Sequence, residues 1–169
     1  YTVGATTTAN GATIADLATA FTPAERTMIA GRILAKCDAL DSAADGIVSD
    51  TAACQKAFSL ADDVPTCSGA RDGTCLTTLQ KDVLANIHAG ARTSTGTAIY
   101  NTFPFDPGIA GNGWAAWEFV NSLALDPLAA GVVFNPNPAF LANPLTASID
   151  ALAAAITATS ATYAVSGMD

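Results

Sequence analysis

The pattern of apolar and polar positions predicts two helices, each of which begins with a clear N-terminal signal. In the first, residues 22–25 (TPAE) place a threonine at the cap, a proline at the first helical position and a glutamate that completes a capping box. The apolar positions that follow at helical spacing are Met28, Ile29, Ile33 and Leu34. This helix is therefore expected to run to about Lys36.

A second capping box is encoded by residues 77–80 (TTLQ), where a cap threonine is followed three positions later by glutamine. The expected apolar face of this helix consists of Leu79, Val83, Leu84 and Ile87. Gly90 is the expected terminator, because glycine readily adopts the left-handed conformation that commonly ends a helix.

Outside these helices the pattern is weaker and indicates short elements. Residues 1–20 are small and polar and are expected to form a strand-like or irregular entry segment, and residues 98–103 are short β candidates. Residues 113–122 and 148–159 are predicted to be helical, whereas three prolines predict a loop in residues 134–144. Together these elements predict a single α+β domain with several short helices, a small antiparallel sheet and long loops.

Four cysteines, at positions 37, 54, 67 and 75, accompany the poorly periodic segment between the two capped helices. An even number without a CxxC pair favours disulfides over metal thiolates or redox chemistry, and it leaves three possible pairings. Disulfides indicate a secreted or periplasmic location; four reduced thiols in a cytosolic protein are the alternative. Residues 1–10 lack the basic region and apolar core of a signal peptide, so that signal is expected outside this chain.

Composition and charge argue against two classes of partner. The formal net charge is −8, and such an acidic surface repels the phosphates of nucleic acid. Apolar runs such as residues 151–156 are far shorter than the roughly 20 residues that a membrane span needs, so no membrane partner is expected. No Lys or Arg follows Arg92, so the C-terminal part of the chain has no side-chain cation with which to bind an anionic ligand.

The segment richest in candidate chemistry is residues 37–50 (CDALDSAADGIVSD), which contains four aspartates. These carboxylates would repel one another if they were brought together without a cation. Calcium binds carboxylate and carbonyl oxygens, which an acidic loop with a glycine can supply. The spacing differs from that of an EF-hand, and the alternative is a solvated acidic turn after the helix.

The run CDALDxxADGIxxD, followed by Cys54, resembles the calcium loop of the tannase/feruloyl esterase family. This family includes tannases, feruloyl esterases and a hydrolase of mono-hydroxyethyl terephthalate. Four further segments are similar to family segments in the same order. They are the preceding helix (FTPAERTMIAGRILAK), the second cysteine pair with the CLT run that begins at Cys75, the WAAW segment and the tail SIDALAAAITATSATYAVSGMD. The resemblance thus extends over nearly the whole chain.

The resemblance implies the ligands of a structural calcium ion. They would be the side chains of Asp38, Asp41 and Asp45 and the backbone carbonyls of Ala43 and Ile47. Ser42 stands where many members have glycine, and a left-handed backbone at that serine would cost about 1 kcal/mol.

The resemblance also implies the pairing of the cysteines and the place of the domain. The cysteines would pair in sequence order, as Cys37–Cys54 and Cys67–Cys75. Residues 1–169 would form one lid domain, inserted in an α/β-hydrolase core that is absent from this chain. Such a lid covers the active site of a carboxylic ester hydrolase and forms part of its aromatic ester pocket, so the implied partners are the hydrolase core and an aromatic ester.

Catalysis in this family uses a Ser-His-Asp triad that lies outside the lid. The present chain has no G-x-S-x-G nucleophile turn. Neither the turn at Ser94 nor the single histidine, His88, is expected to take part in chemistry. The chain alone is therefore expected to be inactive.

Two aromatic residues are the expected substrate contacts. Trp117 matches the second tryptophan of the family's G-W-x-x-W segment, and Phe134 follows a segment that contributes further pocket residues in relatives; core packing is the alternative for each. Some members hold a free carboxylate of the substrate with an arginine in this region. Because Leu128 occupies that position, the parent enzyme is expected to prefer neutral aromatic esters.

Two other functions compete with this interpretation. One is an autonomous extracellular calcium-binding module without an esterase parent. The other is a structural or adhesion domain, for which only the Ala- and Thr-rich composition argues. A serine turn encoded upstream and an Asp and a His encoded downstream would distinguish a lid from both.

Overall fold

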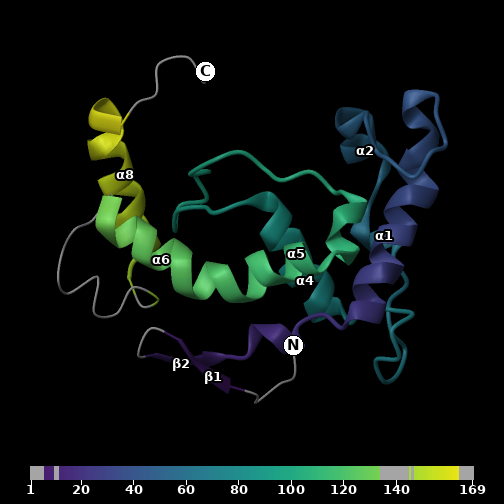
Figure 1. Ribbon diagram of the computed structural model, residues 1–169, viewed down its shortest axis with the longest axis horizontal. Coiled ribbons are helices and arrows are strands. Elements are labelled where there is room, and N and C mark those ends of the chain that lie inside the picture. Colours follow the sequence, from purple (N-terminus) through teal and green to yellow (C-terminus); the bar gives the residue numbers. More distant parts are fainter. Residues whose placement is uncertain (1–5, 10–11, 134–144, 146, 164–169) are drawn as a thin grey trace.

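The computed structural model describes residues 6–9, 12–133, 145 and 147–163, and it confirms an α+β fold (Figure 1). The main elements are β1 Thr6–Ala9, β2 Ala12–Ala15, α1 Pro23–Cys37, α2 Thr51–Ala57, α3 Leu60–Asp63, α4 Thr78–Ala89, α5 Asn112–Ala116, the π-helical turn η4 Trp117–Asn121, α6 Ser122–Val133 and α8 Ile149–Tyr163. Short 3-10 turns are η1 Leu17–Thr19, η2 Asp38–Asp41 and η3 Pro107–Ala110. In Figure 1, α1 and α2 lie at one end of the molecule and α8 at the other, with α6 leading towards α8.

Both predicted capping boxes are formed. At the start of α1, Thr22 accepts a hydrogen bond from the N–H of Glu25, and the Glu25 carboxylate accepts one from the N–H of Thr22. Thr77 and Gln80 make the same reciprocal pair at the start of α4. Gly90 ends α4 with a φ of 72°, as the sequence predicts.

The buried faces of α1 and α4 form the centre of the core. Ile29 and Ile33 of α1 and Leu84 of α4 are completely buried. The prediction that Leu79 belongs to this face is wrong, because its side chain is 48% exposed. The buried face of α4 instead runs through Gln80, Leu84 and His88, which are four residues apart and therefore lie one above another.

A buried polar cluster joins the starts of these two helices to the loop between the second pair of cysteines. Glu25 is fully buried, and its two carboxylate oxygens accept hydrogen bonds from Nε and Nη2 of Arg71 at 2.7 and 2.6 Å. Nε2 of Gln80 donates to the same carboxylate at 3.1 Å. The cluster thus satisfies a charge that the core could not otherwise accommodate.

The sheet lies at the N-terminal end of the chain rather than in the central segment. Strands β1 and β2 pair as an antiparallel hairpin, with Thr6 opposite Ala15 and Ala9 opposite Ala12. Residues 98–103 were predicted as β candidates, but within the described structure they contribute only an isolated bridge between Arg92 and Ala98. The hairpin packs beside η4 and the beginning of α6.

The segment with the cysteines is more ordered than its weak periodicity predicts. Its disulfides are Cys37–Cys54 and Cys67–Cys75, which confirms the pairing in sequence order. Two short helices, α2 and α3, lie within it. Their N-cap residues are Asp50 and Ser59, whose side chains accept hydrogen bonds from backbone N–H groups of the first turn.

The C-terminal half is mainly helical. The prediction of a helix at residues 113–122 is confirmed, and this helix continues through η4 and α6 to Val133. The final predicted helix is α8, whereas the predicted loop of residues 134–144 lies outside the described residues. No helix in the described part of the chain is long and apolar enough to cross a membrane.

Candidate functional site

In the acidic loop after α1, aspartate side chains accept hydrogen bonds from the backbone of the same loop. Oδ1 of Asp38 accepts hydrogen bonds from the N–H groups of Asp45 and Gly46, at 3.2 and 2.9 Å. The two oxygens of Asp41 accept from the N–H groups of Ala43 and Ser49, at 3.0 and 2.9 Å. These two backbone bonds hold the pKa of Asp41 below its usual range.

The predicted calcium ligands meet only part of what a metal site requires. Calcium prefers oxygen donors, and the carboxylates of Asp38, Asp41 and Asp45 all belong to the loop segment of residues 38–45. Nevertheless, nowhere in the described residues do three or more His, Cys, Asp or Glu side chains gather as a metal-binding group. Ser42 does adopt the expected left-handed conformation, with φ 73° and ψ 11°. The calcium site therefore stays a prediction that rests on the type of donor and the shape of the loop.

Trp117 lies at the junction of α5 and α6, where the helix widens into the π-helical turn. Its side chain is 58% exposed, which rules out complete burial in the core. Further large apolar side chains are exposed along the helix that follows: Leu125, Leu128 and Val132. Phe134, the second predicted substrate contact, lies outside the described residues.

A groove of about 500 Å³ opens beside Trp117, between α4 and η4. Two other half-exposed aromatic residues, Tyr100 and Phe103, line it. An adjoining pocket of about 340 Å³ shares Phe103 and Trp117 and also reaches His88. No periodic pattern marks Tyr100 and Phe103 as site residues; the available sign was the occurrence of two aromatic residues in a turn-rich segment.

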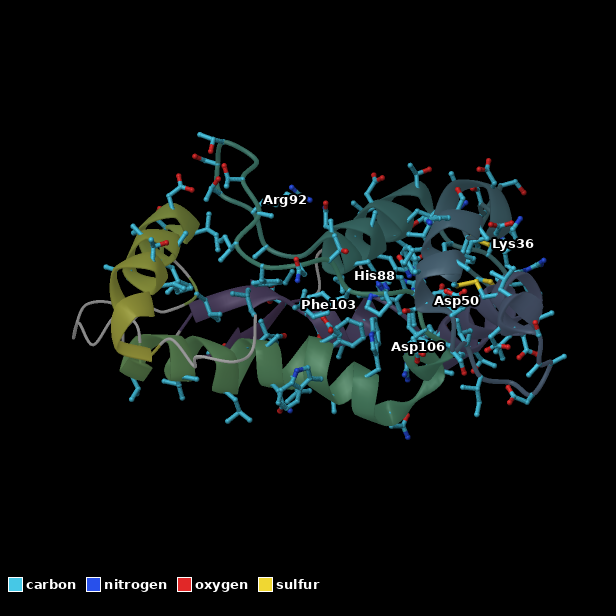
Figure 2. All side chains as sticks on the ribbon, turned by 90° about the horizontal axis from the view of Figure 1, so that it is seen from above. Lys36, Asp50, His88, Arg92, Phe103 and Asp106 are labelled. Carbon is cyan, nitrogen blue, oxygen red and sulfur yellow. A yellow bond between two sulfur atoms is a disulfide. The ribbon has the colours of Figure 1, made fainter. Side chains whose placement is uncertain are left out.

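His88 is buried between α4 and the segment that carries Phe103. Figure 2 shows the two labelled side chains close together, and Nδ1 of His88 lies 3.3 Å from the carbonyl oxygen of Phe103. Its ring centroid is 4.1 Å from that of Phe105. Burial lowers the pKa of His88, although the carbonyls of Phe103 and Pro104 oppose the effect. The imidazole is therefore neutral and contributes to the packing of this core.

Ser94 does not pair with this histidine. Its Oγ donates to the Asp150 carboxylate at 2.6 Å, and its N–H donates to the other oxygen of the same carboxylate at 2.8 Å. These bonds tie an exposed turn to the start of α8 and hold the pKa of Asp150 below its usual range. His88 engages Phe103 and Phe105 instead, so no Ser-His dyad is assembled from these two residues.

Comparison with known proteins adds a consistent set of relatives. The family described as tannase and feruloyl esterase matches residues 3–155. The chain is 35% identical over 111 residues to mono(2-hydroxyethyl) terephthalate hydrolase of Piscinibacter sakaiensis, which covers 57% of this chain and 18% of that protein. It is 42% identical over 86 residues to an esterase of Xanthomonas campestris pv. campestris, described as uncharacterized, with coverage of 50% and 14%.

Two crystal structures of proteins from Aspergillus oryzae resemble this fold. Feruloyl esterase B matches with a TM-score of 0.55 and 25% identity, over 82% of this chain and 27% of that chain. A second esterase matches with a TM-score of 0.52 and 20% identity, over 85% and 27%. The chain thus spans less than a fifth of each curated relative and about a quarter of each solved structure.

Proposed function

Since the chain belongs to the tannase and feruloyl esterase family, we propose that it is the calcium-binding lid of a secreted carboxylic ester hydrolase. Its partner is the α/β-hydrolase core of the parent enzyme, and its ligand is an aromatic ester. The small share of each relative that the chain spans supports a larger parent protein. Family membership favours this function over an autonomous calcium-binding module.

The observation that carries the proposal is the set of large apolar side chains that are exposed along η4 and α6. Trp117, Leu128 and Val132 are between 42 and 67% exposed. Large apolar side chains that stay exposed along one helix are typical of a surface that binds a partner or a ligand. As part of a lid, this surface covers the active site, excludes water and contacts the aromatic part of the ester.

The electrostatics of the same region favour a neutral substrate. No Lys or Arg follows Arg92 in the sequence, and Leu128 presents an apolar side chain where an arginine would hold a carboxylate. A free carboxylate on the ester would lose its hydration without gaining a cation. The parent enzyme is therefore expected to hydrolyse neutral aromatic esters faster than acid-bearing ones.

The chain contributes no catalytic triad in this proposal. Its single histidine is buried against Phe105, and Ser94 binds Asp150. The isolated chain is therefore expected to leave an aromatic ester intact. Hydrolysis by a chain in which both His88 and Ser94 are replaced would contradict this proposal. Other residues of the chain would then have to be catalytic.

The lid is tested in the parent enzyme by replacing Trp117 with alanine. Loss of one aromatic contact is expected to lower kcat/KM for a neutral aromatic ester by about tenfold or more. Leu79→Ala is the matched control, because Leu79 is also an apolar side chain about half exposed, and it lies outside the groove beside Trp117 and the adjoining pocket. Equal kcat/KM values for both variants and the unchanged enzyme would refute the lid function.

Calcium binding is tested on the chain itself by thermal unfolding in excess calcium and in EDTA. A ligand that binds only the folded state adds about 2.7 kcal/mol at one hundred times its Kd, which raises the Tm by roughly 5–10 °C. Replacement of Asp38 or Asp45 by asparagine should abolish the shift. Asp72→Asn is the control, since Asp72 also accepts a hydrogen bond from a nearby backbone N–H but lies in another loop. An unchanged Tm in the metal-free, folded chain would refute the calcium site.

The two disulfides support a secreted or periplasmic location, because such bonds persist in oxidising compartments. Mass measurement of the native protein without reductant checks this point. The mass should correspond to four fewer hydrogens than the fully reduced chain. A native protein that carries four free thiols would contradict export.

A further inference from the structure

One ring nitrogen of His88 is buried without a hydrogen-bond partner. The residue is 7% exposed, and its ring forms part of the wall of the adjoining pocket of about 340 Å³. Within the part of the chain that the structure describes, no group forms a hydrogen bond with Nε2 of this ring. A buried polar atom in that condition costs free energy, so native proteins nearly always give it a partner.

The backbone at Phe103 decides which ring nitrogen carries the proton. Nδ1 of His88 lies 3.3 Å from the carbonyl oxygen of Phe103, and a carbonyl oxygen can only accept a hydrogen bond. In the other direction, the N–H of Phe103 donates to the carbonyl of His88 at 2.8 Å, which holds the two segments together. Nδ1 is therefore the protonated nitrogen of the neutral ring, and Nε2 presents a lone pair.

A lone pair at Nε2 restricts the partner to a molecule that donates a hydrogen bond. Carboxylates, ketones and ethers offer only acceptor oxygens, so none of them can satisfy this atom. A metal ion would need several ligands, but the described ranges hold no group of three or more His, Cys, Asp or Glu side chains that could bind one. The partner must therefore carry an O–H or N–H group.

The pocket has the space and the acceptors that a water molecule needs. Its volume is about ten times the volume that one water occupies in the liquid. Asp106 lines the pocket and lies in the same part of the molecule as His88 in Figure 2; its Oδ1 accepts from the N–H of Gly108 at 2.7 Å. The carbonyl of Pro104 lies beside the imidazole, where it acts to raise the pKa of the ring. A water that donates to Nε2 thus finds an acceptor for its second hydrogen.

We propose that this pocket binds one ordered water molecule, which donates one O–H to Nε2 of His88 and the other to the Pro104 carbonyl or the Asp106 carboxylate. The water completes the hydrogen bonding of the ring and keeps the proton on Nδ1. It thereby secures the bond between the imidazole and Phe103, which joins that segment to α4. Neither a hydrolase core nor an ester takes part, so failure of this water site would leave the lid function untouched.

The test combines nitrogen NMR of the imidazole with a crystal structure of the oxidised chain. His88 is the one histidine of the chain, so its ring signals can be observed without overlap. At neutral pH, a proton on Nδ1 and none on Nε2 are expected, together with a cross-peak between the ring proton Hε1 and a long-lived water. The crystal structure should show a water oxygen about 2.7–3.2 Å from Nε2. A proton on Nε2, or no water at that position, would overturn the proposal.

Two variants identify the group that holds the water. His88→Phe keeps a buried ring against Phe105 but has no nitrogen, so its crystal structure should lack the water. Asp106→Asn keeps an acceptor oxygen, so the water and the protonation of both ring nitrogens should be unchanged. A water that persists in His88→Phe would overturn the assignment to Nε2, as would its loss in Asp106→Asn. The spectra of the unchanged chain provide the decisive result if His88→Phe does not fold.

Discussion

Replacing Arg71 by methionine tests how the buried polar cluster supports the fold. The change keeps an unbranched side chain but removes the hydrogen bonds from Nε and Nη2 to the Glu25 carboxylate, together with those from Nη1 to the Thr19 carbonyl and from Nη2 to the Ala20 carbonyl. Gln80 and the Thr22 N–H remain as donors to that carboxylate. A fully buried negative charge is then left without its cation.

Removing one partner of a buried ion pair costs about 3–5 kcal/mol. The Glu25 side chain is completely buried, but Arg71 is 24% exposed, so the lower end of that range, about 3 kcal/mol, is expected. For a domain of this size, the corresponding fall in Tm is roughly 6–12 °C. The control is Lys36→Met, which breaks the exposed pair between Lys36 and Asp63 and should cost at most about 1 kcal/mol.

The dependence on pH separates loss of the ion pair from simple loss of packing. Burial by itself raises the pKa of Glu25, but the hydrogen bonds from Arg71, the Thr22 N–H and Gln80 outweigh it and hold the pKa below its usual value. In the unchanged chain, stability from Glu25 is therefore present at neutral pH and is lost as the pH falls through the folded pKa. In Arg71→Met, the effect of burial outweighs the remaining hydrogen bonds and raises the pKa of Glu25. Protonation of Glu25 at acid pH then removes the buried charge and restores part of the lost stability.

The assay is urea unfolding of both chains at pH 7 and at about pH 4, with disulfides intact. The difference in the free energy of unfolding should be about 3 kcal/mol at pH 7 and should narrow towards acid pH. In Arg71→Met combined with Glu25→Gln, much of the loss should be recovered, since no charge remains buried. A loss below about 1 kcal/mol at pH 7, or a difference that is independent of pH, would refute the reasoning.

Three further predictions follow from single sites. The imidazole of His88, the one histidine of the chain, should titrate below about 6.5 in a proton NMR experiment, because burial favours its neutral form. The stability that this neutral group contributes is lost as the pH falls. A titration midpoint at or above about 6.5 would contradict the burial. Ser42→Gly should raise the free energy of unfolding by about 1 kcal/mol, since φ at Ser42 is 73°, and a loss of stability would contradict the left-handed backbone. Replacement of both Cys37 and Cys54 by alanine should lower the free energy of unfolding by about 3 kcal/mol, because the disulfide joins residues 17 apart. An unchanged midpoint of urea unfolding would show that the disulfide does not restrain the unfolded chain.

The sequence determined the features that depend on near neighbours. Each capping box acts across three residues, so TPAE and TTLQ were sufficient to place the starts of α1 and α4, and Gly90 the end of α4. The left-handed backbone at Ser42 and the pairing of the cysteines came from the resemblance of two short segments, residues 37–54 and 66–77, to a family, and the structure agrees with both. Short helices capped by Asp50 and Ser59 escaped prediction because a helix of one or two turns has too few apolar positions to reveal a period.

Only the tertiary structure decided which side chains are buried and which form a site. Leu79 was assigned to the core by its apolar character, yet the α4 face that packs inward is the one that carries Gln80 and His88. Arg71 lies 46 residues from Glu25, and no local pattern brings those two charges together. The groove likewise depends on a turn-rich segment that folds back over α4, so that Tyr100 and Phe103 meet Trp117. These outcomes depend on contacts between distant segments, whose free energy is set by packing and desolvation in three dimensions rather than by the spacing of residues along the chain.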